Sequence, residues 1–261
     1  MSALRSLALA VSAAVVGILV VTLTPVASLA RVPGPIHAGN TYGWYRSHLW
    51  RQEFKGRKPA FWHVKGPGIV RDQHGMLTLN TSTRGTVSAT LARPGHRVGR
   101  WEIRLRSRRY ETGHTNYRVV TELIPSGTRP YHCGARNVAL ENYVPGGHRV
   151  QFYIRTLPNN NFGAFDRRGL RNDQWHTFAV EVTRKHISWF VDAHVVRTER
   201  RAAALKGVPL TLRFEMQATP GVRMNRSRMQ MDWMRFWTTE TPDTKSIKAP
   251  RTQLTTYQRA C

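Results

Sequence analysis

Cysteines and acidic residues are scarce in this sequence. The 261 residues include two cysteines, and 15 Asp and Glu against 40 Lys and Arg, so the formal net charge is +25. Two cysteines are too few for a disulfide scaffold, and the repeated long apolar runs of a multi-span membrane protein are missing. Hydrophobic residues make up 41% of the chain, which excludes wholesale disorder. The charge predicts attraction to a polyanion without identifying it.

The first thirty residues are predicted to be a secretory signal peptide. Arg5 is their only charged residue, residues 7–23 are nearly all apolar, and the small residues Ser28 and Ala30 form a cleavage-site pattern. We therefore expect a secreted or cell-envelope protein of bacterial type. The alternative is an uncleaved segment, which would then be the only membrane attachment that we expect.

The rest of the chain is predicted to be one all-β domain. Residues 31–45 are rich in Gly, Pro and aromatics and are expected to be an extended N-terminal segment, whereas residues 239–261 are expected to form a loose or draped tail. Between them, residues 46–238 alternate apolar and polar positions, as in 100–106, with turn residues between the alternating segments. Many short strands without a long amphipathic helix predict a sandwich or jelly roll.

The two cysteines are predicted to pair with each other. Cys133 lies in the body and Cys261 in the tail, and an oxidising compartment would favour a disulfide between them. Such a bridge would tie the tail to the domain. The alternative is two unrelated thiols.

Six segments, taken in order, resemble motifs of glycoside hydrolase family 16. Each segment is a weak signal alone, but the order over residues 50–238 is specific. The segments are 50–56, 72–79, 99–104, 175–182, 187–195 and 231–237. The resemblance implies a concanavalin A-like β-jelly roll of two antiparallel sheets, with a glycan cleft across the concave sheet.

The catalytic motif of that family, E-x-D-x-x-E, is where this sequence departs from it. A retaining glycosidase needs two carboxyls about 5–5.5 Å apart. The matching segment is 136–143, in which Glu141 takes the acid/base position, Arg136 the nucleophile position and Val138 that of the central Asp. Without a bulge, the last two positions fall on Asn137 and Ala139. No register restores the pair, whereas an arginine in a cleft suits a carboxylate or phosphate on the ligand.

Two hypotheses follow for function. The first is a binder of an anionic or cell-envelope polysaccharide. Its candidate ligand contacts are Arg136, Tyr143, Tyr117, His132 and Phe152. The second is an active retaining hydrolase or transglycosylase on a β-glycan, with Glu141 as acid/base and Glu122 as a displaced nucleophile. The alternative for Glu122 is a solvent-facing position or an ion pair with an arginine.

The sequence also leads to expectations about nucleic acid, oligomeric state and cofactors. A nucleic-acid binder driven by charge alone is a poor third hypothesis, because the signal peptide and the jelly roll disfavour it. We expect a monomer and no cofactor for chemistry. The resemblance implies a structural calcium ion, for which Glu53 and Asp232 match the expected positions and supply hard oxygen ligands.

Overall fold

The computed structural model describes residues 36–55, 61–126, 136–205, 207–242, 245 and 248–257. The chain divides into two units, residues 1–34 and 35–261, and only the second contains described residues. The predicted signal peptide, both cysteines and His132 therefore lie outside the described residues. Within the described part, no helix has the length and apolar character needed to cross a membrane.

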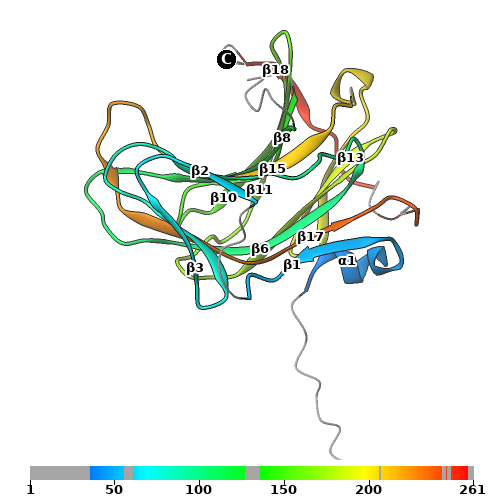
Figure 1. Ribbon diagram of the computed structural model, residues 1–261. Helices are drawn as coiled ribbons and strands as arrows, with labels where there is room; N and C mark the ends of the chain where they lie inside the picture. Colours follow the sequence, from blue (N-terminus) through cyan, green and yellow to red (C-terminus); the bar gives the residue numbers. More distant parts are fainter. Residues whose placement is uncertain are drawn as a thin grey trace, which may run out of the picture. The chain divides into compact units, whose positions relative to one another are not determined.

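The second unit is built from two antiparallel sheets of eight strands each among the described residues (Figure 1). The first sheet has the order β14 (His194–Glu199), β13 (Ile187–Val191), β12 (His176–Val182), β6 (Gly99–Arg109), β17 (Ser227–Trp237), β4 (Met76–Asn80) and β3 (Ile69–Gln73), and β1 (Leu49–Gln52) also pairs with β17. The second sheet has the order β18 (Gln253–Thr256), β11 (Asn160–Arg167), β10 (Arg149–Thr156), β9 (Arg136–Tyr143), β8 (Arg118–Pro125), β15 (Leu210–Gln217), β5 (Val87–Leu91) and β2 (Trp62–Lys65). A short parallel pair, β7 (Thr115–Asn116) and β16 (Met224–Asn225), completes the strands, and η2 (Ala202–Ala204) is a single 3-10 turn.

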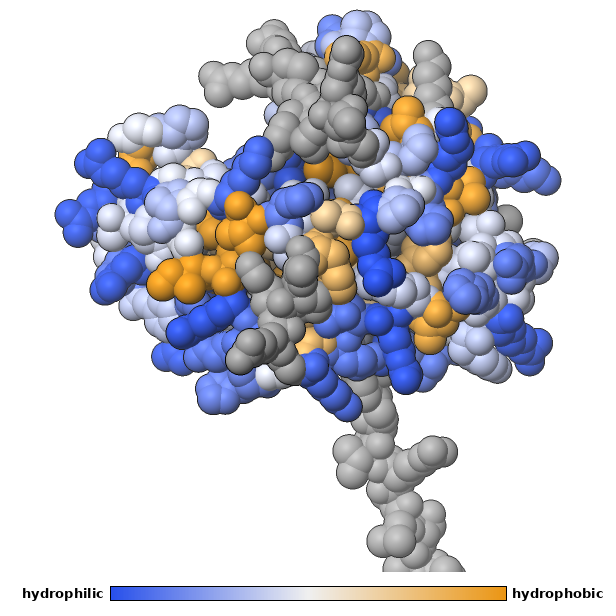
Figure 2. All heavy atoms as spheres, viewed as in Figure 1, coloured by the Kyte–Doolittle hydropathy of each residue, from blue (hydrophilic) through white to orange (hydrophobic). Residues whose placement is uncertain are grey.

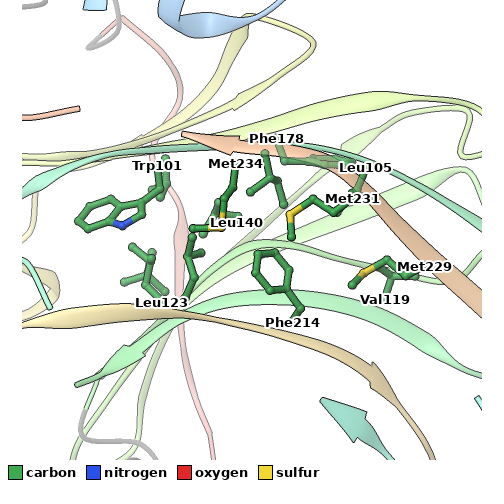
Figure 3. Close-up of a cluster of buried hydrophobic side chains, with 14 of the residues drawn as sticks. Trp101, Leu105, Val119, Leu123, Leu140, Phe178, Phe214, Met229, Met231 and Met234 are labelled. Atoms are coloured by element: carbon green, nitrogen blue, oxygen red, sulfur yellow. The ribbon is translucent and has the colours of Figure 1, made fainter. Parts of the chain in front are cut away.

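The hydrophobic core lies between the two sheets (Figure 3). Successive residues of a strand face opposite sides, so each strand sends every second side chain inward. Trp101 and Leu105 of β6 meet Phe214 of β15 in this way, and all three are buried. The indole nitrogen of Trp189 also donates a 2.8 Å hydrogen bond to the Ala139 carbonyl oxygen of the opposite sheet. The predicted all-β jelly-roll sandwich is confirmed.

The N-terminal segment is helical in part, whereas the sequence predicts an extended chain. It forms α1 (Ala38–Thr41) and the 3-10 turn η1 (Trp44–Arg46). The buried Glu102 carboxylate accepts hydrogen bonds from the amides of Ala38, at 2.5 Å, and Gly39, at 3.0 Å. Trp44 is fully buried against Phe190 and Trp237 of the first sheet. The helix is therefore decided by tertiary contacts, because a carboxylate satisfies the free amides of its first turn.

Part of the C-terminal tail is also ordered by pairing, because β18 lies along the edge strand β11. The register runs from Asn160 opposite Thr256 to Gly163 opposite Gln253. The Tyr257 amide donates a 2.7 Å hydrogen bond to the Asn159 carbonyl oxygen. The side chains of β18 are all exposed, so burial leaves no apolar pattern from which this strand could be predicted.

Candidate functional site

A bulge between β8 and β9 decides which side chains reach the outward face of the second sheet. Thr121 pairs with Glu141, but the next residue, Glu122, pairs with Ala139. Leu140 is therefore the extra residue of a β-bulge, which interrupts the alternation of the strand. Leu140 and Glu141 both have no exposed surface, and Figure 3 shows Leu140 among the core side chains.

Glu141 consequently lies on the inner side of the sheet, opposite Thr121. Burial raises the pKa of its carboxyl well above the usual range, and the hydroxyl and amide of Thr121 oppose the shift only in part. Glu122 has the opposite orientation, because it alternates with the inward-facing residues Val119, Thr121 and Leu123. The sequence-based pairing of Glu141 with Glu122 is therefore corrected: the two side chains leave neighbouring strands toward opposite faces.

Arg136 shares the inward orientation. It alternates with Val138, which packs in the core, and it is 1% exposed. Burial lowers the pKa of its guanidinium to about 10. The side chains of β9 that face outward are instead Asn137, Ala139 and Asn142. Their spacing is that of E-x-D-x-x-E, and none is a carboxylate. The sequence indicated Asn137 and Ala139 in one register and missed Asn142, because the bulge sets the third position.

The aromatic residues predicted to contact a ligand fill the interior. Tyr117, Tyr143 and Phe152 belong to the core and are at most 2% exposed. The Tyr117 hydroxyl donates to the Gly85 carbonyl oxygen at 2.9 Å, and that of Tyr143 donates to Ser107 Oγ at 3.2 Å. These rings therefore stabilise the sandwich and do not line the outward face of the second sheet.

Glu122 is the predicted site residue that does lie on the outward face. Its Oε1 accepts a hydrogen bond from the Tyr153 hydroxyl. Its Oε2 accepts from Arg213 Nη2 at 2.7 Å and from Asn137 Nδ2 at 3.2 Å. Three donors from three neighbouring strands thus fix the carboxylate, which is 3% exposed. The alternative in which Glu122 pairs with an arginine is confirmed.

A second outward-facing carboxyl, Glu215, was missed by sequence reasoning. Its Oε1 lies 3.2 Å from Arg213 Nε, the same guanidinium that contacts Glu122. Burial raises the pKa of Glu215 to about 7; Arg213 opposes the shift and the charge of Glu122 adds to it. The signal in the sequence was the alternation of β15, which places Thr211, Arg213 and Glu215 on the polar face.

Next to these carboxyls the outward face holds a pocket of about 430 Å³. Three strands and the turn after β9 supply polar and basic side chains, and β11 supplies an aromatic ring. The lining residues are Arg118, Asn142, Val144, Gly147, His148, Arg149, Gln151 and Phe165. Arg118 Nε donates to Asn142 Oδ1 at 2.6 Å, and the Arg149 guanidinium lies 3.6 Å from the Phe165 ring centroid. Burial lowers the pKa of Arg118.

The strand register connects this pocket with the carboxyls. Glu215 pairs with Val120, Val120 with Asn142, Asn142 with Gln151, and Gln151 with Phe165. These five residues form one row across the outward face, but Val120, between Glu215 and the pocket residue Asn142, is only 1% exposed. Arg213, Glu122, Ala139 and Tyr153 form the adjacent row.

A second pocket, of about 290 Å³, is mostly apolar. It is lined by His48, Trp50, Leu91, Arg93, Pro94, His96, Trp101, Leu210, Thr211, Leu212, Met234 and Phe236. Because several of these are core residues of both sheets, the pocket extends the hydrophobic interior. Two of its polar lining residues lie against aromatic rings, Arg93 over Trp50 and His96 on Phe236.

The residues expected to hold calcium each face an arginine. Arg235 Nη2 lies 3.4 Å from Glu53 Oε1, and Arg104 Nη1 contacts Asp232 Oδ2. In the part of the chain that the structure describes, no three metal-ligating side chains gather in one place. Calcium needs six to eight oxygen ligands, so these two carboxylates give it a poor fit. A structural calcium stays a prediction.

Hydrophilic side chains cover much of the face of the molecule shown in Figure 2, with hydrophobic side chains in smaller groups between them. With a net charge of +25, the surface as a whole favours anions. Within the pocket, Arg118 is held by Asn142 and Arg149 lies over an aromatic ring.

The comparisons with known proteins concern the fold. The sequence matches no family model, and a search of curated proteins finds no match either. Solved structures do match. The laminarinase from Rhodothermus marinus has a TM-score of 0.58 at 15% identity, over 74% of this chain and 98% of that one. An endo-1,3-beta-glucanase catalytic domain from Thermotoga petrophila RKU-1 gives 0.58 at 11%, over 75% and 100%. SCLam, an endo-beta-1,3(4)-glucanase from family GH16, gives 0.59 at 14%, over 74% and 91%. The chain therefore has the jelly-roll fold of the GH16 glucanases.

Proposed function

We propose that this chain is a carbohydrate-active protein that binds an anionic glycan across the outward face of the second sheet. The observation that carries the proposal is the pocket that contains Arg118, His148 and Arg149. Carbohydrate as the ligand class is supported by the fold, which is shared with glucanases and laminarinases.

The chemistry of the pocket favours a glycan with carboxylate, sulfate or phosphate groups. A guanidinium presents a planar set of donors that matches such groups with two parallel hydrogen bonds. Arg149 lies over the Phe165 ring and Arg118 is held by Asn142, so little side-chain freedom is lost when an anion binds. Phe165 is 42% exposed and offers a ring face to a sugar.

The composition of β9 supports binding rather than the double displacement that uses E-x-D-x-x-E. The outward-facing Asn137, Ala139 and Asn142 have that spacing and carry no acid. An amide can hydrogen-bond a sugar hydroxyl as donor and acceptor, but it cannot act as the nucleophile or proton donor.

We further propose that the protein works as a monomer outside the cytoplasmic membrane, secreted or associated with the cell envelope. The signal-peptide pattern of the first thirty residues supports this location. Anionic polymers of that environment are then the expected ligands. The same compartment would favour the Cys133–Cys261 disulfide.

Replacing Arg118 or Arg149 with glutamine is expected to weaken binding of oligogalacturonides about tenfold each, the loss of one charge-assisted hydrogen bond. Isothermal titration calorimetry measures the dissociation constants. Raising the salt concentration should weaken binding by the wild-type protein more than by the variants.

Arg46→Gln is the matched control, because it removes the same charge at a distant position. Arg46 is exposed in η1, on the first sheet's side of the domain. The variant should bind like the wild type. If Arg46→Gln and Arg149→Gln lose the same affinity, net charge accounts for binding and the pocket proposal is wrong. If the wild type binds neutral laminarin oligosaccharides as tightly as oligogalacturonides, the anionic groups do not matter and the proposal is also wrong.

A further inference from the structure

The pocket of about 290 Å³ has an apolar floor between the two sheets. Strands β6 and β17 of the first sheet and β5 and β15 of the second supply this floor. Its side chains are at most 7% exposed: Leu91, Trp101, Leu210, Leu212, Met234 and Phe236. Figure 3 shows Trp101 at one end of the labelled core side chains. The pocket therefore continues the core toward solvent, away from the outward face of the second sheet.

The mouth of this pocket carries basic and aromatic side chains. His48, Arg93 and His96 are exposed, and Trp50 is half-buried. No Asp or Glu is among the lining residues that the structure describes. The floor is thus apolar and the mouth is basic, which is the division expected of a site for a molecule with an apolar tail and an anionic head.

Arg93 supplies the charge at the mouth and has no carboxylate partner in the described part of the chain. Its guanidinium carbon lies 4.6 Å from the Trp50 ring centroid and 5.0 Å from that of Phe61. By contrast, Arg104 of the first sheet contacts Asp232. Ring contacts orient the Arg93 guanidinium without neutralising it, so an anionic head group can still take its N–H donors.

His96 is held at the mouth by both sheets. Its amide donates to the Leu210 carbonyl oxygen at 3.0 Å and its carbonyl oxygen accepts from the Leu210 amide at 3.0 Å. Its ring stacks on Phe236 with 4.2 Å between the centroids. Burial lowers the pKa of His96, so its ring is largely uncharged at neutral pH. The mouth is thus fixed before a ligand arrives, which reduces the cost of binding.

An alkyl chain suits the floor better than a sugar does. The Thr211 hydroxyl already donates to the Leu91 carbonyl oxygen at 2.8 Å, so sugar hydroxyls would be buried there without good partners. A methylene group loses nothing by leaving water, and each one buried raises affinity about fourfold. At about 30 Å³ for a group the size of a water molecule, the pocket holds a chain of about ten carbons.

We propose that this pocket binds a free single-chain amphiphile with an anionic head, such as a medium-chain fatty acid. Its alkyl tail lies on the floor between the sheets, and its carboxylate lies at Arg93. The inference does not depend on the glycan-binding function, because the two pockets share no lining residue.

The first test measures the binding of octanoate, decanoate and dodecanoate to the full chain by isothermal titration calorimetry, below their micelle concentrations. Affinity should rise about fourfold for each added methylene up to about ten carbons and then stay level. Decanol, which has no charge, and decyltrimethylammonium, which has the opposite charge, should bind about tenfold more weakly or worse than decanoate.

Variants assign the head and the tail to their places. Arg93→Gln should weaken decanoate binding about tenfold and leave decanol binding unchanged, a difference that a merely structural role would not produce. Leu212→Phe fills part of the floor and should weaken both; if thermal melting shows that it is unfolded, Leu91→Phe narrows the same floor. The matched control is Arg46→Gln, which removes an exposed guanidinium 5.8 Å from the Tyr45 ring and should bind like the wild type.

Tryptophan fluorescence locates the bound chain. Decanoate with bromine on its last carbon quenches tryptophans that it contacts, and Trp101 is the tryptophan on the floor. Most of the quenching should be lost in Trp101→Phe. Absence of decanoate binding would show that the pocket is only a gap in the packing. Equal binding of decyltrimethylammonium, affinity independent of chain length, or unchanged quenching in Trp101→Phe would each overturn the proposal and leave the glycan-binding function untouched.

Discussion

Glu181→Ala is expected to lower the free energy of unfolding by ~3–5 kcal/mol, the usual effect of breaking a buried ion pair from one side. Glu181 Oε2 lies 2.6 Å from Arg100 Nε, and the two side chains are 1% and 2% exposed. His186 Nε2 lies 2.7 Å from the other carboxylate oxygen. Without the carboxylate, the Arg100 guanidinium would stay buried, and its remaining partners among the described residues would be the carbonyl oxygens of Thr238 and Thr241 and the Trp44 ring. Urea unfolding followed by tryptophan fluorescence measures the change.

The matched control is Glu111→Ala, which removes an acid from an exposed ion pair with Arg226. Solvent screens such a pair, so the urea midpoint should hardly move. If both variants lose the same stability, burial does not determine the contribution of Glu181, and the interpretation of the Arg100–Glu181 pair is wrong.

Glu141→Leu is expected to raise the free energy of unfolding by ~1–3 kcal/mol at pH 8, the usual cost of a buried polar group without good hydrogen bonds. Neither carboxyl oxygen of Glu141 has a hydrogen-bond partner of good geometry among the described residues. The leucine keeps a similar volume and removes the group that must be desolvated. Chemical unfolding of wild type and variant at several pH values measures the difference.

The sign of the pH dependence follows from the raised pKa of Glu141. The folded state favours the protonated carboxyl of Glu141. The contribution of this protonation to the free energy of unfolding is complete below the unfolded-state pKa and is lost as the pH rises through the folded-state pKa. The advantage of Glu141→Leu should therefore grow from pH 4 to pH 8. Glu141→Gln, which cannot ionise, should show the same trend. A variant that is less stable than wild type at every pH would mean that the carboxyl has a stabilising partner.

The fold was predictable because local alternation encodes it. Residues 100–106 alternate so regularly that β6 and its inward face could be read from the sequence, and the turns between strands are rich in Gly, Pro and Asn. Each strand carries this information by itself, so no knowledge of its neighbours was needed. The same argument explains why the sandwich was expected without a match to any family model.

The candidate site was less predictable because it depends on register. The bulge at Leu140 reverses the orientation of Glu141, and a bulge is defined only by the pairing of β9 with β8 and β10. Glu215 and Glu122 lie far apart in the sequence, and only the pairing of β15 with β8 brings them to one guanidinium. Motif alignment pointed to Glu141 because it is the only acid in its segment. In the structure, Glu122 and Glu215 share the outward face of the second sheet, and Glu141 lies on the inner face.

The pairing of β18 with β11 covers a backbone edge of the second sheet. Until Thr256 has been added to the growing chain, residues Asn160–Gly163 of β11 have a free backbone edge. Unpaired edges join readily to the edges of other chains. A variant that lacks β18 would keep the rest of the second sheet but leave this edge of β11 free to join another chain.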